Sequence, residues 1–152
     1  MKLSPNFSLA EFTKSATATR LRIDITNPPA AAIECMKDLC VHILEPLRRA
    51  FDRPVRISSG YRSLQFNQLI GGAEKSQHVY GQAADIEIPG VPNDLIWQYI
   101  VDQLPFDQVI AEHLNSKDGA AGWIHVSYVP QGRREALSCV RGDYLPGLVY
   151  ED

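Results

Sequence analysis

The chain has 152 residues, 45% of them hydrophobic and 22% charged, a composition typical of a soluble globular domain. Its net charge of −3 gives no strongly basic surface for nucleic acid. No apolar run approaches the roughly 20 residues that cross a bilayer, and residues 1–8 lack the apolar stretch of a signal peptide. We therefore expect a single domain over residues 1–152, made in the cytoplasm, monomeric and without membrane insertion.

Helices are predicted first along the chain. Residues 8–16 read as a short helix, because a serine N-cap is followed three residues later by a glutamate, as in a capping box. A longer helix opens at Asn27–Pro28, and apolar residues recur at helical spacing from Ile33 to Leu47. Pro46 predicts a kink near the end of this helix.

Strands dominate the rest of the chain. They are predicted for residues 54–58, 83–88, 106–112, 122–129 and 136–140. A helix over residues 93–103 interrupts them, while residues 59–78 and 142–147 are rich in turn formers. Because helices come first and the later strands lie close together, we expect an α+β domain with a central antiparallel sheet and helices packed on one side.

Three residues of metal-binding type have compatible contexts: His78, Asp85 and His125. A helix would hold His78 and Asp85 about 10 Å apart, so their spacing of seven residues fits a loop that enters a strand. Strand alternation puts His125 on one face with Trp123 and Ser127, and the apolar residues between them on the other. Two imidazoles and one carboxylate suit Zn²⁺ and leave a fourth position for water, as in catalytic zinc sites. The alternative is two unrelated histidines.

These segments resemble the M15 zinc peptidases. The residues that carry the resemblance are SQHVYGQAADI at 76–86 and WIHVS at 123–127. The similarity is greatest to the subfamily of zinc D-Ala-D-Ala carboxypeptidases and phage peptidoglycan endopeptidases. It extends to residues 7–12, to the loop at 58–63 and to the strand at 106–112. The resemblance implies a hedgehog/DD-peptidase-like fold with the zinc site at the sheet edge.

The resemblance also implies site residues. His78, Asp85 and His125 would bind Zn²⁺, and Arg62 would bind or polarise the peptide at its carboxylate or its scissile carbonyl. The guanidinium suits that role because its fixed fork of donors matches a carboxylate or a developing oxyanion. The alternative for Arg62 is a surface ion pair with an acidic residue such as Glu74.

The general base departs from the family pattern. Several M15 branches carry an acidic residue three positions before the second zinc histidine, where this chain has Gly122. We expect the base to be Glu112, which ends the strand that precedes the strand of His125. Asp118 and His113 are the alternatives, the latter because a neutral imidazole accepts a proton near pH 7.

The residues predict hydrolysis of peptide-like amides at zinc, and the resemblance implies stem or cross-bridge peptides of peptidoglycan as the substrate. Both an endopeptidase and a D,D-carboxypeptidase fit. Without a signal peptide or a separate wall-binding domain, the expected role is that of a phage-type endolysin or a virion-associated lysin that acts on the cell wall after release. The alternative is a non-catalytic zinc-containing binding module of the same fold, which the glycine at the usual base position favours.

Overall fold

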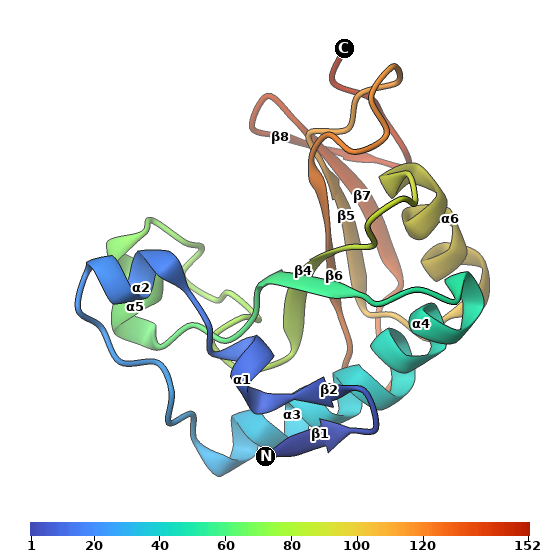
Figure 1. The fold of residues 1–152 in the computed structure, drawn as a ribbon. Coiled ribbons are helices and arrows are strands. Elements are labelled where there is room, and N and C mark those ends of the chain that lie inside the picture. The colour runs from blue at the N-terminus through green and yellow to red at the C-terminus, as the bar shows by residue number, and fades with distance from the viewer.

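A mixed six-stranded sheet forms the centre of the computed structural model, which describes all 152 residues (Figure 1). The order of its strands is β3-β4-β6-β5-β7-β8. Their bounds are Arg56–Ser59 for β3, Ala83–Glu87 for β4, Gln108–Glu112 for β5, Trp123–Ser127 for β6, Glu135–Val140 for β7 and Asp143–Pro146 for β8. The α+β class expected from the sequence is confirmed.

One strand pair breaks the expected antiparallel pattern. β5 and β7 are parallel, whereas the other neighbouring pairs are antiparallel. After β6 the chain crosses over the start of β5 within residues 128–134 and enters the sheet on the other side of that strand. β7 therefore runs opposite to β6 and in the same direction as β5, so the prediction of an antiparallel sheet is wrong for this pair.

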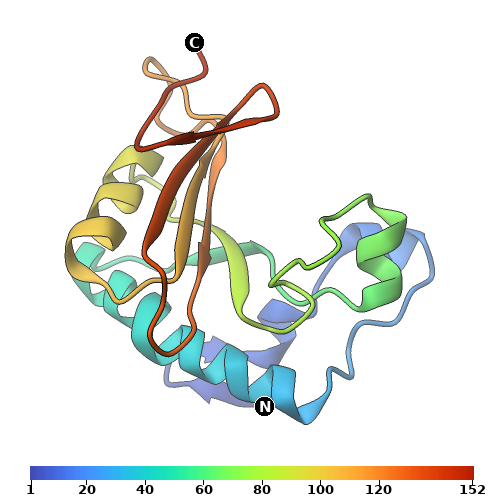
Figure 2. The same cartoon turned by 180° about the vertical axis from the view of Figure 1, so that it is seen from behind.

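The long helices cover one face of this sheet, as predicted (Figure 2). They are α3 (Ala30–Leu39), the π-helical turn η1 (Cys40–Leu44), α4 (Glu45–Phe51) and α6 (Asn93–Gln103). Pro46 lacks an amide hydrogen, so it interrupts the regular hydrogen-bond ladder, and the wide turn η1 stands directly before it. No helix has both the length and the apolar character needed to cross a membrane.

Several short helices and strands were not predicted from the sequence, or were predicted with other bounds. β1 (Lys2–Ser4) and β2 (Phe7–Ser8) form a small antiparallel pair. The predicted helix over 8–16 is instead α1 (Leu9–Phe12), with the expected capping box, followed by a separate α2 (Ala16–Arg20). The segment expected to be irregular contains α5 (Leu64–Leu69).

Side-chain alternation in β4 and β6 decides where polar residues can lie. Ile86, Ile124 and Val126 are fully buried in the core beneath the helices. Successive side chains of a strand point to opposite faces, so Asp85 and His125 point away from the helices. β4 and β6 are inner strands, because β3 covers the outer side of β4. These residues therefore lie on the open face of the sheet, and the prediction of a site at the sheet edge is wrong.

Candidate metal centre and active-site groove

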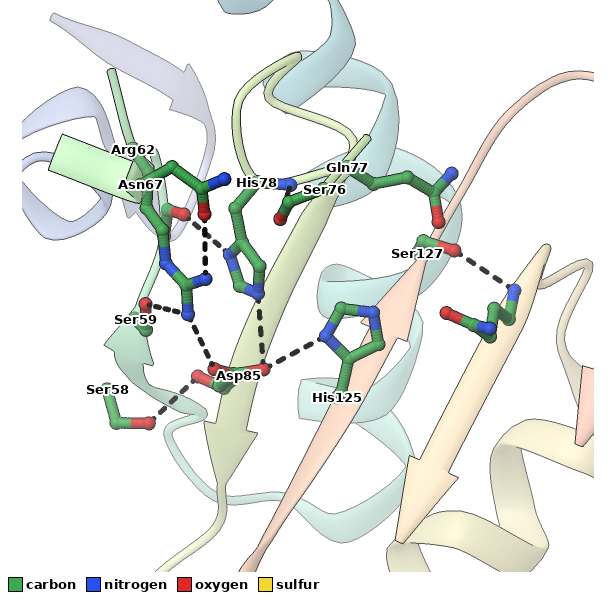
Figure 3. A network of polar contacts seen from close by, with 12 residues as sticks. Ser58, Ser59, Arg62, Asn67, Ser76, Gln77, His78, Asp85, His125 and Ser127 are labelled. Atoms are coloured by element: carbon green, nitrogen blue, oxygen red, sulfur yellow. Dashed lines mark hydrogen bonds and ion pairs between the residues drawn. The ribbon is translucent and has the colours of Figure 1, made fainter. Parts of the chain in front are cut away.

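His78, Asp85 and His125 converge on the open face of the sheet (Figure 3). Asp85 and His125 are directly paired between β4 and β6, while His78 comes from the loop before β4. One potential ligand atom from each residue lies within 4.8 Å of the others. Asp85 Oδ1 is 3.4 Å from His78 Nε2 and 3.0 Å from His125 Nδ1. The structure therefore brings together the three residues that the sequence singled out.

The hydrogen bonding of His78 fits a metal ligand. Its Nδ1 lies 2.8 Å from the carbonyl oxygen of Gly60, which can only accept, so Nδ1 donates its proton there. Nε2 is then left with a lone pair directed at the Asp85 carboxylate. Two electron-rich groups at this distance are compatible when a cation lies between them. Metal-bound histidines usually donate their other N–H in this way, and the donor set is one that Zn²⁺ prefers.

The charge state of Asp85 also fits a metal ligand. Burial alone would raise its pKa, but the contacts of the carboxylate with the imidazoles of His125 and His78 outweigh burial and hold the pKa of this carboxyl well below its usual range. Asp85 therefore stays ionised, as a metal ligand requires.

Gly60 links the metal centre to the N-terminal region. A Cβ atom on Gly60 would lie 2.7 Å from both Cα and the carbonyl oxygen of Phe12, so only glycine fits against α1. The next amide, of Tyr61, donates to the Phe12 carbonyl over 2.8 Å. This packing fixes the carbonyl that orients His78. The sequence analysis placed Gly60 in the loop at 58–63 and missed this role, because the contact with Phe12 is not local.

Arg62 lies beside the three converging side chains. Its Nη2 is 3.7 Å from Asp85 Oδ2, and Asp85, not Glu74, is its ion-pair partner. Nη1 donates to Asn67 Oδ1 and Nη2 to Ser59 Oγ. Burial lowers the pKa of the guanidinium and the charge of Asp85 opposes that shift, while its buried Nε has no hydrogen-bond partner. An unpaired buried donor of this kind is uncommon and costs free energy.

A groove of about 660 Å³ passes over the centre. The open face of the sheet forms its floor, and residues 71–78 form part of its wall. Among the three candidates for the general base, Glu112 lines the groove. His113 instead contacts Glu151, with 2.6 Å between Nδ1 and Oε2, and the exposed Asp118 accepts a hydrogen bond from the amide of Ala120.

Glu112 has the environment of a proton acceptor. It shares the open face with His125, because β5 pairs with β6 so that Glu112 faces Trp123, two rungs along from the pair of Ile110 and His125. Burial raises the pKa of Glu112, and the negative charge of Asp85 raises it further. A carboxylate whose pKa is shifted toward neutrality is well matched to general acid–base chemistry.

Gly122 occupies the position where the resemblance implied an acidic residue, and the backbone there leaves no room for a side chain. Its φ is +75°, a left-handed conformation that favours glycine. A Cβ atom here would lie 1.9 Å from the carbonyl oxygen of Glu112 and 2.7 Å from that of His113. The backbone of the β5–β6 connection therefore excludes a side chain at 122.

A metal centre of two histidines and one aspartate, beside a half-buried carboxylate in a groove, is typical of metal-dependent hydrolases. A sequence model of the family described as peptidase M15 matches residues 5–127, and the chain belongs to this family. The chain is also 43% identical over 44 residues to the zinc D-Ala-D-Ala carboxypeptidase of Streptomyces albus G, a stretch of 28% of this chain and 17% of that protein. The chain thus matches less than a fifth of this relative.

Proposed function

We propose that this protein is a zinc peptidase that hydrolyses peptide bonds of peptidoglycan, with His78, Asp85 and His125 as the zinc ligands. The observation that carries the proposal is the convergence of these three side chains within 4.8 Å, on the floor of a groove that Glu112 and Arg62 also line. Membership of the peptidase M15 family and the similarity to a zinc D-Ala-D-Ala carboxypeptidase support the metal and the substrate class.

The residues around the centre divide the chemistry of amide hydrolysis. Zinc bound there would supply Lewis acidity, which acidifies water and polarises a carbonyl. Glu112 takes the proton of the attacking water and then delivers it to the leaving amine. Arg62 donates hydrogen bonds to the oxygen on which negative charge develops, or to a carboxylate of the peptide. Its place in the lining of the groove and its position beside Asp85 support this role.

The proposed substrate is peptidoglycan, without a choice of the particular peptide bond that is cleaved. A groove of about 660 Å³ lies in the size range of sites that bind extended or drug-sized ligands. Both stem and cross-bridge peptides fit the proposal, and so do endopeptidase and D,D-carboxypeptidase activity. A role as a phage-type endolysin or a virion-associated lysin, acting on the cell wall, stays a prediction from the sequence.

Digestion of purified peptidoglycan tests the proposal. The zinc-loaded protein should release soluble peptides, and mass spectrometry of their new termini would identify the bond that is cleaved. Glu112→Gln should reduce the rate about 100- to 10,000-fold, the range that general acid–base groups contribute.

Asp118→Asn is the matched control, because Asp118 is an acidic side chain outside the groove, and it should leave the rate unchanged. Binding of peptidoglycan without release of any peptide would favour the non-catalytic module. Full activity of Glu112→Gln would overturn the assignment of the base.

A further inference from the structure

Cations outnumber carboxylates among the side chains that line the groove, whereas acidic residues outnumber basic ones in the whole chain. Arg62, Lys75 and Arg133 line it, against the carboxylates of Asp85 and Glu112. The chain as a whole carries a net charge of −3. A bound zinc ion would increase the positive excess in the groove. A concentration of positive charge in a concave site favours a negatively charged ligand.

Arg133 is positioned by a buried carboxylate, that of Asp107. The Asp107 carboxylate, only 4% exposed, accepts a hydrogen bond from the backbone amide of Arg133 over 3.1 Å and lies 3.4 Å from its Nε. A Cβ atom on Gly132 would lie 2.8 Å from Cα of Asp107, so the loop packs tightly at this point. The same carboxylate accepts hydrogen bonds from Gln77 and Ser127, which adjoin the histidine-bearing segments.

The guanidinium of Arg133 still has donors for a ligand. Nη2 donates to Gln77 Oε1 over 3.4 Å, and Nη1 is 3.8 Å from Glu135 Oε1. Together with Nε, these contacts use at most three of the five guanidinium N–H donors. The side chain remains 53% exposed. It is therefore held from behind by a buried carboxylate and open toward the groove, a preorganised arrangement that lowers the entropic cost of binding.

The groove has two chemically different ends. Gln108 and the loop of Arg133 lie at the end of the sheet where β5 and β7 begin. Trp123 and Tyr144 lie at the opposite end, on the rung of Glu112. The pair of Asp85 and His125 lies between them. A peptide that crosses the metal centre therefore meets polar, cationic groups on one side and aromatic groups on the other.

We propose that Arg133 is a binding site for a free carboxylate of the peptide substrate, at the polar end of the groove. The proposal rests on the proposed peptidase function and adds to it a preference for acidic peptides. A guanidinium binds a carboxylate through two parallel hydrogen bonds, which gives it geometric selectivity that the flexible Lys75 lacks. Arg133 lies beyond residues 5–127, so this preference belongs to a part of the chain that the family match does not cover.

A matched pair of peptides tests the carboxylate site. Two synthetic peptides would reproduce the sequence around the bond cleaved in peptidoglycan, one with a free side-chain carboxylate and one with the corresponding amide. For the acidic peptide, Arg133→Gln should raise KM about tenfold, as expected for the loss of a charge-assisted hydrogen bond, and leave kcat nearly unchanged. For the amide peptide, the same substitution should change neither constant.

Binding provides a second measurement that needs no bond cleavage. Calorimetric titration of both peptides into the zinc-loaded Glu112→Gln protein should show about tenfold tighter binding of the acidic peptide, a difference that disappears when Arg133→Gln is added. Arg141→Gln is the control variant, because Arg141 is an exposed arginine that donates to the Asp152 carbonyl and does not line the groove. It should retain the preference.

Three results would overturn the carboxylate site. They are equal binding of the two peptides by the wild type, an equal effect of Arg133→Gln on both peptides, and loss of the preference in Lys75→Gln rather than in Arg133→Gln. Failure of the proposed function would look different. The preference in binding would remain, while the zinc-loaded wild type cleaved neither peptide.

Discussion

The two faces of the central sheet come from the same strands and have opposite properties. In β6, Ile124 and Val126 are completely buried beneath the helices, while His125 between them reaches the groove. In β4, Ile86 is completely buried, and the adjacent Asp85 belongs to the converging metal-binding group. One face therefore stabilises the fold through the burial of apolar side chains. The other face carries charged side chains that can bind a metal ion and a substrate.

This difference teaches that adjacent residues can be changed with separate consequences. A substitution on the helix-covered face should lower stability and preserve the chemistry of the folded molecules. A substitution of a metal-binding residue on the groove face should abolish metal binding and leave the core intact.

The largest effect is expected from Asp85→Asn on the groove face. The amide keeps the size of the side chain but removes the negative charge that a divalent ion requires, so zinc affinity and hydrolysis should both collapse. The rate should fall about 1000-fold or more, since a catalytic metal supplies several kcal/mol of transition-state stabilisation. Zinc content and peptide release would be measured together. A variant that retains both would remove Asp85 from the metal centre.

The next largest effect is expected on the covered face, from Ile124→Ala. This residue adjoins His125 and is 0% exposed, so its truncation leaves a cavity in the core. The free energy of unfolding should fall by about 2–5 kcal/mol, measured by denaturant titration. Ile124→Val, as the milder control, should cost about 0.5–1.5 kcal/mol. Zinc binding per folded molecule should not change, and its loss would contradict the separation of the faces.

Gly122→Ala should lower both the stability and the activity of the protein, whereas the preceding variants each affect one of these properties. A side chain here meets the Glu112 carbonyl and must adopt a strained left-handed backbone. The strain should cost about 1–3 kcal/mol of unfolding free energy, and the displaced backbone should also lower activity by moving Glu112. Thermal melting and peptide release would be compared. Unchanged values for both would contradict the steric account of the missing acidic residue.

The smallest effect concerns a buried polar group on the helix side, Glu45. Its carboxylate accepts hydrogen bonds from the Ser4 hydroxyl, from the Asn6 amide and from the Asn6 side chain. Burial would raise its pKa, but hydrogen bonds from Asn6 and Ser4, together with the charge of Arg48, outweigh burial and lower it. Glu45→Gln should therefore cost about 1–3 kcal/mol at pH 7.

The pH dependence of this loss has a definite sign. A depressed pKa in the folded state adds stability above the unfolded pKa, near 4.3 for glutamate, and this contribution disappears as the pH falls through the folded value. The difference in unfolding free energy between wild type and Glu45→Gln should therefore be constant near neutrality and shrink below about pH 4. A difference that grows on acidification would contradict this account.

Local sequence patterns were enough to predict many of the secondary-structure elements and the three residues of the metal centre. Apolar alternation around His125 correctly predicted its strand and the face on which it lies, and the spacing of His78 and Asp85 correctly predicted a loop that leads into a strand. These features depend on neighbouring residues only, so the sequence is enough to predict them.

Features that depend on distant partners escaped prediction. All four residues of β8 are exposed, so it shows no alternation and forms only because β7 lies beside it. α5 has six residues and is held by the burial of Phe66 rather than by length or periodicity. The role of Gly60 depends on contact with Phe12, far away in the sequence. Tertiary packing creates each of these features, and one sequence does not reveal it.

Anomalous diffraction from crystals of the zinc-loaded protein tests the central claim most directly. Data collected on either side of the zinc absorption edge should show one ion between Nε2 of His78, the carboxylate of Asp85 and the ring of His125, with Glu112 and Arg62 facing the same groove. A zinc ion bound by other residues, or protein that takes up no zinc while these three side chains keep their positions, would contradict the account.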